Sequence, residues 1–203
     1  MRIPDKATFT SYFTSYCFLS IVFAVVYGGT NYLASLREHR ATLYLPIEQH
    51  IPFVPQFIFV YLSVFAVFVL PVFYIKQSQV LALSKAFLFS LLVAALFHLL
   101  VPLDLAHVRS NNVEFMPGLF QLLYWFALPH NLMPSLHITF TVLFLGLCIA
   151  LEPVRLLRAA LYVWGVLLFL SVLLMHQHQL IDIPTGSLLG WVAYKFIFKR
   201  SQR

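Results

Sequence analysis

Near the end of the chain lies the stretch MHQHQLIDIPTG (residues 175–186), which interrupts a long run of apolar sequence with polar side chains. The chain is 61% hydrophobic and only 10% charged, and polar groups at the edge of a membrane segment are costly unless they have a partner or a function. His178 and Asp182 are four residues apart, so on a helix they would share one face. A carboxylate that holds one imidazole nitrogen leaves the other free to act as a nucleophile or base. The sequence therefore predicts a reactive histidine here.

The composition is that of a membrane protein with one domain. The 203 residues include 21 Phe and 10 Tyr, and the mean hydropathy of +0.87 is too high for a soluble domain. No internal repeat and no shift in composition divides the chain, so residues 1–203 are expected to form one membrane-embedded domain. The net charge of +6 does not indicate nucleic-acid binding, because no basic stripe with interleaved aromatic residues occurs.

Apolar segments of about twenty residues predict an all-α bundle of six transmembrane helices. The expected spans are 12–33, 57–75, 86–103, 134–151, 159–175 and 183–198. Segment 117–128 is too short and too aromatic to cross, and its Tyr124 and Trp125 suit the headgroup region. We therefore expect a short interfacial helix before the fourth span.

The distribution of basic residues predicts the orientation. Six crossings put both termini on one side, together with a short loop expected to hold Lys76 and Lys85. That side collects ten of the 13 Lys and Arg residues: Arg2, Lys6, Lys76, Lys85, Arg155, Arg158, Lys195, Lys199, Arg200 and Arg203. The other side collects Arg37, Arg40 and Arg109. Cytoplasmic termini follow, with His137, His178 and Asp182 on the opposite face; the small size and the lack of a sorting tail predict a bacterial inner membrane with a periplasmic site.

A second polar stretch, MPSLH (133–137), is expected to face the first. His178 would attack a phosphorus centre, with Asp182 fixing its tautomer, and His137 would give a proton to the departing group. Pro134 is suited to the first position of a helix. Ser135 and the free N–H groups of that helix start would bind phosphate oxygens.

The histidines allow two other interpretations. His176 and His178 are possible metal ligands, but residues two apart on a helix diverge and no further carboxylate lies nearby, so no metal or other cofactor is expected. A non-catalytic lipid-binding or transport protein would use the histidines as a proton relay. Transporters more often place ionisable groups at mid-membrane, and the clustering at one edge argues against that class.

The quoted residues resemble a known family. Pro134-Ser135-Leu136-His137, followed by Ser171, His178 and Asp182 at their spacing, resembles the type 2 phosphatidic acid phosphatase superfamily of membrane lipid phosphatases and phosphotransferases. The likeness is nearest to the branch that contains inositol phosphorylceramide synthases, and the IPFVP turn at 51–55 also resembles that branch. The resemblance implies a six-helix fold, a phosphohistidine at His178 oriented by Asp182, His137 as the acid and Ser135 as a phosphate ligand.

The sequence departs from the family pattern in two places. Val172 follows Ser171 where the family usually has an arginine, and the first family motif, a lysine with Arg-Pro seven residues on, is absent. The corresponding loop offers Arg109 as the best substitute cation. Gln177 and His176 are expected to add hydrogen bonds to the substrate phosphate.

The acceptor decides the reaction. Water would make the protein a lipid phosphatase, and a lipid hydroxyl would make it a head-group phosphotransferase. Small outer loops favour an open site and water, so we expect a phosphatase. Its substrate would be a lipid phosphate that enters sideways from the outer leaflet, such as phosphatidate, phosphatidylglycerol phosphate or a polyprenyl diphosphate.

Overall fold

The structure is a computed structural model that describes residues 1–107, 109 and 113–202. The described residues form helices and loops, with one isolated parallel bridge between Ala41 and Leu103, so the all-α prediction is confirmed. In chain order the elements are α1 (Lys6–Ser35), η1 (Pro46–His50), η2 (Pro55–Phe57), α2 (Ile58–Leu62), α3 (Val64–Val69), η3 (Leu70–Phe73), α4 (Gln77–Leu100), α5 (Pro117–Phe126), α6 (Leu136–Phe140), η4 (Thr141–Leu145), α7 (Gly146–Leu151), α8 (Arg155–Leu174), α9 (Asp182–Val192), η5 (Ala193–Phe198) and η6 (Arg200–Gln202).

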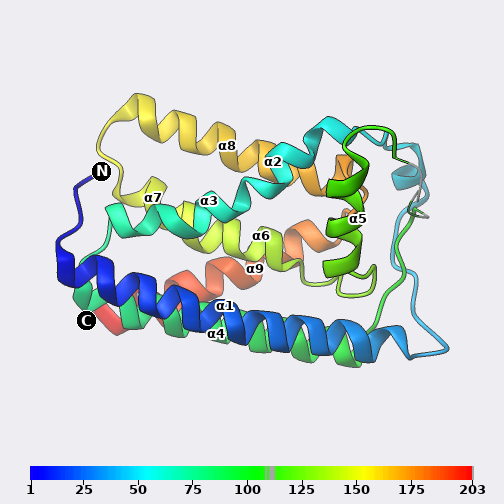
Figure 1. Ribbon diagram of the computed structural model, residues 1–203, viewed down its shortest axis with the longest axis horizontal. Coiled ribbons are helices and arrows are strands. Elements are labelled where there is room, and N and C mark those ends of the chain that lie inside the picture. Colours follow the sequence, from blue (N-terminus) through cyan, green and yellow to red (C-terminus); the bar gives the residue numbers. More distant parts are fainter. Residues whose placement is uncertain (108, 110–112, 203) are drawn as a thin grey trace.

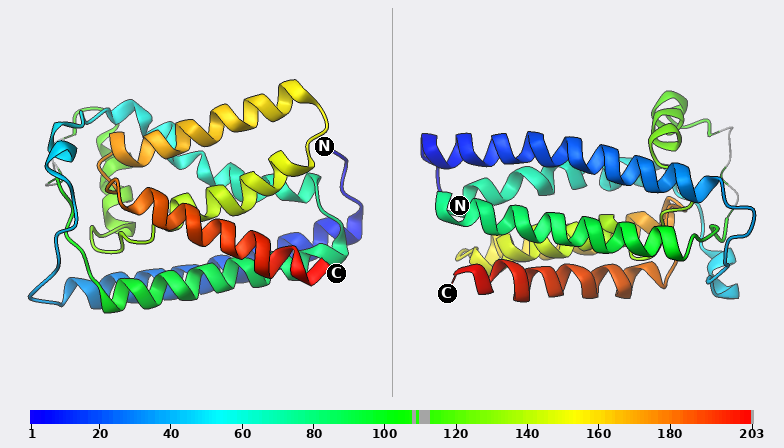
Figure 2. Two further views of the ribbon diagram at one scale, coloured as in Figure 1. Left: turned by 180° about the vertical axis from the view of Figure 1, so that it is seen from behind. Right: turned by 90° about the horizontal axis from the view of Figure 1, so that it is seen from below.

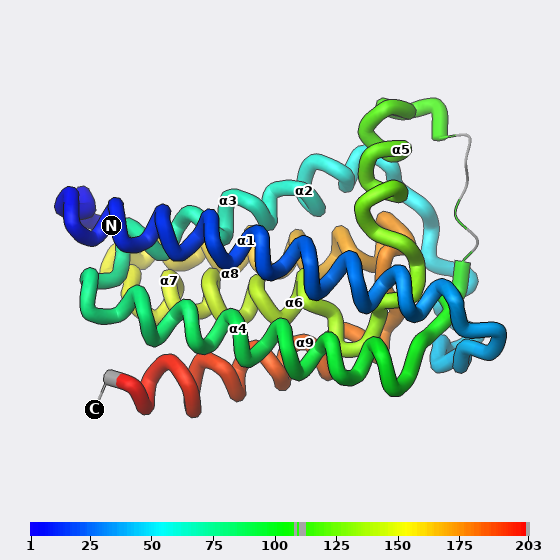
Figure 3. The backbone as a smooth tube through the Cα atoms, turned by 60° about the horizontal axis from the view of Figure 1, so that its bottom comes forward, coloured from blue at the N-terminus to red at the C-terminus, as the bar shows by residue number. Residues whose placement is uncertain are grey.

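The long helices run side by side along one axis, and α5 lies across them near one end (Figure 1). Both ends of the chain lie at the opposite end of the bundle, in the front view and in the rear view alike (Figures 1 and 2). Helix α1 packs along α4 over most of its length (Figure 3). The predicted short helix at 117–128 is thus present as α5.

Four helical segments are long and apolar enough to cross a membrane, namely Lys6–Ser35, Pro55–Phe73, Gln77–Leu100 and Arg155–Leu174. They indicate a membrane protein. The segment Leu136–Leu151 is apolar but shorter. Helix length and composition alone therefore support four of the six expected spans.

Several predicted boundaries were wrong by a few residues. Helix α1 already begins at Lys6, because the carboxylate of Asp5 accepts a hydrogen bond from the N–H of Thr8 at 2.7 Å and caps the helix. Helix α4 begins at Gln77, so Lys85 lies on a helix and not in a loop. Its side chain is exposed, and a lysine stem can cover an apolar helix surface while its charged end reaches water.

The helical segment that contains α2 and α3 is interrupted at Ser63, which lies between the two helices. Its hydroxyl donates to the carbonyl of Val60 at 2.6 Å, a local bond that competes with the helix ladder. The same hydroxyl accepts a hydrogen bond from the indole of Trp164 at 2.8 Å. The break is therefore tied to α8.

Aromatic rings fill the centre of the bundle. Phe87 of α4 and Phe140 of α6 stack with their centroids 4.5 Å apart, and Phe68 and Phe144 meet them edge to face. Phe23 of α1 lies against the same cluster. This packing holds α6 in the interior.

Helices α6 and α9 approach each other closely because of two glycines. A Cβ on Gly186 would lie 2.7 Å from the carbonyl oxygen of Ser135, and one on Gly190 would lie 2.5 Å from that of Thr139. Small residues spaced four apart are a common device for close contact between membrane helices. The hydroxyl of Thr139 donates to the carbonyl of Gly186 at 3.1 Å across this contact. The helix that carries His137 is thereby fixed against the helix that begins with Asp182.

Candidate active site

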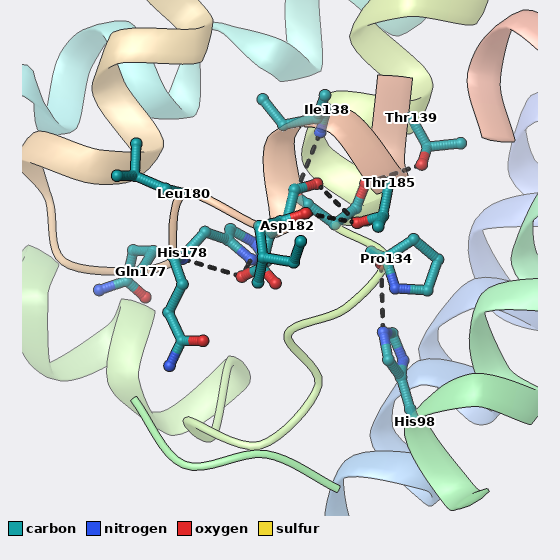
Figure 4. A network of polar contacts seen from close by, with 12 residues as sticks. His98, Pro134, Ile138, Thr139, Gln177, His178, Leu180, Asp182 and Thr185 are labelled. Carbon is teal, nitrogen blue, oxygen red and sulfur yellow. Dashed lines mark hydrogen bonds and ion pairs between the residues drawn. The ribbon is translucent and has the colours of Figure 1, made fainter. Parts of the chain in front are cut away.

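The predicted contact between His178 and Asp182 is present. Nδ1 of His178 lies 3.0 Å from Oδ2 of Asp182, whose side chain is fully buried, while 9% of the His178 side chain is exposed (Figure 4). The same oxygen accepts the N–H of Gln179 at 2.9 Å. Because the carboxylate occupies Nδ1, Nε2 is the ring nitrogen available for chemistry.

The two residues do not share a helix, which corrects the simplest version of the prediction. Helix α8 ends at Leu174 and α9 begins at Asp182, so His178 lies in the turn between them. Asp182 opens α9, where the helix dipole favours a negative charge. The spacing of four still brings the side chains together, because the turn folds back at Gln179.

His176 shapes this turn through its backbone. Its φ of 50° is left-handed, and its N–H donates to the carbonyl of Leu173 while the N–H of Gln177 donates to that of Val172. This pair of bonds is a Schellman motif, which usually places glycine at the left-handed position. The imidazole Nε2 lies 2.9 Å from the carbonyl of Ile51, and the ring stacks on His107 with centroids 3.6 Å apart. The structure thus engages His176 with the outer loops and not with the site, where a phosphate-binding role was predicted.

His137 lies one residue into α6 and stacks on Tyr61 of α2, with ring centroids 4.4 Å apart. Its Nε2 is buried and has no hydrogen-bond partner among the described residues. The helix starts at Leu136, so Pro134 is not its first residue as predicted. The carbonyl of Pro134 instead lies 3.3 Å from Nε2 of His98 (Figure 4).

Ser135 is the N-cap of α6. Its hydroxyl accepts the N–H of Ile138 at 3.3 Å, and the residue is fully buried. The side chain that was expected to bind phosphate therefore caps the helix, and it occupies one of the N–H groups that were expected to be free.

His137 and His178 line the same cavity, which has a volume of about 720 Å³. Tyr27, Tyr61 and Asn131 line it beside them. The amide of Asn131 donates to the carbonyl of Tyr27 at 3.0 Å and to the hydroxyl of Thr30 at 2.9 Å, which joins the loop before α6 to α1. The two imidazoles thus open into one space, as the sequence predicted.

Arg109 lies in the loop between α4 and α5. Its guanidinium donates to Oε1 of Gln177 at 2.7 Å and to the carbonyl of Ala127, and it lies 4.9 Å from the centre of the Tyr124 ring. Burial lowers the pKa of Arg109, while the nearby Tyr61, Tyr27 and Tyr124 act in the opposite direction. An arginine keeps its charge in such a setting. Two predicted phosphate ligands, Arg109 and Gln177, are therefore bonded to each other.

Glu48 and Asp104 hold the turn from outside. The buried carboxylate of Glu48 accepts the N–H of Leu45 at 2.7 Å and that of Leu180 at 2.8 Å. The carbonyl of Asp104 accepts the side-chain amide of Gln179 at 2.6 Å, and its carboxylate pairs with Arg40 at 2.6 Å. These contacts tie the loop after α1 and the loop after α4 to the turn that carries His178.

Sequence reasoning missed Tyr61, Glu48 and the two glycines of α9. Tyr61 gave no signal, because one tyrosine within an apolar span is ordinary. Gly186 and Gly190 did carry a signal, the small-xxx-small spacing of close helix pairs. Glu48 also carried a signal, because one acidic residue in a short loop of a membrane protein calls for a partner.

Among the described residues, no group of three or more His, Cys, Asp or Glu side chains is placed to hold a metal ion. Comparisons with protein-family models, with curated proteins and with solved structures found no match to this chain. Function must therefore be argued from the geometry of the site.

Proposed function

We propose that the protein is a membrane phosphatase that cleaves a lipid phosphate through a phosphohistidine at His178. The observation that carries the proposal is the His178–Asp182 pair, 3.0 Å apart and opening into the cavity that His137 also lines. One imidazole is held by a buried carboxylate, and the other has a nitrogen, Nε2 of His137, with no partner among the described residues. That arrangement suits a nucleophile and a separate acid.

The reaction has two steps. Nε2 of His178 attacks phosphorus as the bond to the lipid oxygen breaks, and protonated His137 gives its proton to that oxygen. Water then attacks the phosphohistidine, His137 takes a proton from it, and the N–P bond breaks to release phosphate. Asp182 holds the imidazole of His178 in one tautomer and balances the positive charge that forms on it.

Arg109 and Gln177 would supply the contacts to the phosphate. Neither is among the residues that line the cavity, but Arg109 donates to the carbonyl of Ala127, which does line it. The guanidinium has a further buried nitrogen, Nε, without a hydrogen-bond partner in the described part of the chain. A bound phosphate would compete for the same donors that now bond Gln177 and Ala127. The site would thus hold its anion by one cation and several hydrogen bonds.

The proposal includes six membrane crossings, with the segments Leu136–Leu151 and 182–198 as the two additional spans. Both segments lie alongside the four longer ones, and both chain ends lie at one end of the bundle (Figures 1 and 2). Most of the basic residues belong to that end; Arg203, counted with them, lies outside the described residues. We place this end in the cytoplasm and the histidine site on the periplasmic face of a bacterial inner membrane.

Phosphate release from a panel of lipid phosphates by the purified protein tests the proposal. We expect release with and without chelator, and its loss in His178→Ala and in His137→Ala. His50→Ala is the matched control, because His50 is an exposed histidine of η1 near the same loops. Release that survives in His178→Ala would refute the proposal. Transfer of the head group to an added lipid alcohol, without free phosphate, would show the phosphotransferase instead.

A further inference from the structure

The cavity is polar at one end, and the rest of its length is lined, among the described residues, by uncharged side chains. Its histidines and Asn131 lie at the outer end, and its lining then follows α1 inward from Gly28 to Tyr12. At about 1.5 Å per residue this is ~24 Å of helix axis. A bilayer hydrocarbon core is about 30 Å thick. The cavity thus extends through most of the depth that a membrane would occupy.

The remainder is a groove between α1 on one side and α2 and α3 on the other. Leu19 and Phe23 line it from α1, Phe65 lines it from α3, and Phe87 and Phe140 form its floor. Among the described residues, no Lys, Arg, Asp or Glu side chain lines the cavity. Such a surface offers contacts to hydrocarbon and few to a polar molecule.

The inner end of the groove lies at Tyr12, the lining residue of α1 nearest to the N-terminus. Its hydroxyl donates to the carbonyl of Phe68 at 2.5 Å, and its side chain is almost fully buried. Phe144, which also lines this end, packs edge to face on Phe68 with centroids 5.3 Å apart. The hydrogen bond links α1 to α3 across the groove, at the point where its lining ends.

We propose that this groove binds a hydrocarbon tail of the lipid phosphate, and that Tyr12 sets the greatest tail length that fits. The proposal rests on the proposed function for the position of the head, which would lie against His178. A tail in lipid gains little hydrophobic energy by entering an apolar groove, so the length preference must come from packing. Binding should improve until the tail reaches Tyr12, and a longer tail should then be overpacked and bind about tenfold more weakly.

Binding of non-hydrolysable alkyl phosphonates of increasing chain length, measured by competition against one labelled alkyl phosphonate, tests the proposal without turnover. We expect an optimum length in the unmodified protein. Tyr12→Ala should move the optimum to longer tails and relieve the roughly tenfold penalty. Leu19→Trp, which fills the groove above Tyr12, should move it to shorter tails.

Two further variants complete the test. Tyr12→Phe keeps the ring and removes only the bond to Phe68, so it serves if Tyr12→Ala does not fold, and it should weaken the length limit. Phe13→Ala is the matched control, since the neighbouring aromatic side chain is 56% exposed and lies outside the cavity lining; its length profile should equal that of the unmodified protein. A profile without an optimum, or an optimum unmoved by Tyr12→Ala and Leu19→Trp, would overturn the proposal. A length optimum in a protein that releases no phosphate would support the groove and refute only the phosphatase.

Discussion

Two buried carboxylates lie at opposite ends of the bundle, Asp182 beside the cavity and Glu152 between α7 and α8. Both side chains are fully buried. Asp182 uses one oxygen for His178 and for the N–H of Gln179, and its other oxygen is buried without a partner in the described part of the chain. Glu152 uses both oxygens, accepting from the N–H of Val154 at 2.9 Å and from the hydroxyl of Tyr74 at 2.6 Å.

The two carboxylates differ as a structural acid differs from a functional one. The partners of Glu152 are a backbone N–H, a tyrosine hydroxyl and the N-terminal ammonium group of Met1, 3.5 Å from Oε2. A carboxylate needs such partners to remain buried. Asp182 is less fully bonded, and it holds an imidazole that faces an open cavity. A buried polar group that stays partly unsatisfied is costly, and such a cost is common where a function requires it.

The largest effect is expected when the charge of Asp182 is removed. Asp182→Asn keeps the size of the side chain but no longer fixes the tautomer of His178 or balances its charge. We expect phosphate release to fall by about 10³- to 10⁴-fold with little loss of stability. Steady-state kinetics on a responsive lipid phosphate measures this. A loss of less than about tenfold would contradict the assigned role of Asp182.

The next largest effect is expected at the contact between α6, which carries His137, and α9, which begins with Asp182. Gly190→Ala would place a methyl group against the carbonyl of Thr139, which cannot move without shifting α6. We expect a loss of about 2 kcal/mol in stability, together with reduced activity. Thermal unfolding in detergent measures it. Gly146→Ala, at the start of α7, is the control, because nothing outside its own helix backbone lies within 4 Å of the added carbon. Unfolding of both variants at the same temperature would contradict the close contact between Gly190 and Thr139.

Glu152→Gln tests the other carboxylate. The hydrogen bond from Tyr74, followed by that from Val154, holds the pKa of Glu152 below its ordinary value of 4.5. The charged form therefore contributes stability that is present above pH 4.5 and is lost as the pH falls through the lower pKa of the folded protein. We expect a lower melting temperature at neutral pH, a difference that shrinks in acid, and unchanged phosphate release per folded molecule. Loss of phosphate release in folded Glu152→Gln would contradict a purely structural role for Glu152.

The smallest effects are expected at His176, two residues from the nucleophile. His176→Gly and His176→Asn suit the left-handed backbone and should change stability by less than about 1 kcal/mol, whereas His176→Val should cost about 1–2 kcal/mol. Burial lowers the pKa of His176, with His107 adding to this and the Ile51 carbonyl opposing it. The neutral ring thus contributes stability at pH values above its ordinary pKa of 6.5, and this contribution declines as the pH falls. Unfolding measured against pH should show no such decline in His176→Asn. A loss of phosphate release in His176→Asn as large as in Asp182→Asn would restore the substrate-binding role.

The sequence predicted well what depends on local spacing and on composition. The helical class, the short helix α5 and the contact between His178 and Asp182 all follow from apolar run length and from a separation of four residues. Helix ends were less predictable, because caps decide them: Asp5 extends α1, and Ser135 delays the start of α6 to Leu136.

Long-range contacts could not be predicted from one sequence. The stacking of Tyr61 on His137 joins segments far apart in the chain, as does the hydrogen bond from the N–H of Leu180 to the carboxylate of Glu48. The phosphate-binding role expected for His176 stays a prediction, although its ring lies against the Ile51 carbonyl and stacks on His107. A polar residue beside a reactive one looks like a ligand in a sequence, because the sequence shows neither its backbone angle nor its partner.

Trapping the phosphorylated protein tests the central claim most directly. Brief incubation with a phosphorus-labelled lipid phosphate, followed by denaturation at alkaline pH and peptide mapping, should yield an acid-labile label on His178 and none in His178→Ala. The His50→Ala control should carry the label as the unmodified protein does. A label on another residue, or turnover without any acid-labile label on His178, would contradict the account.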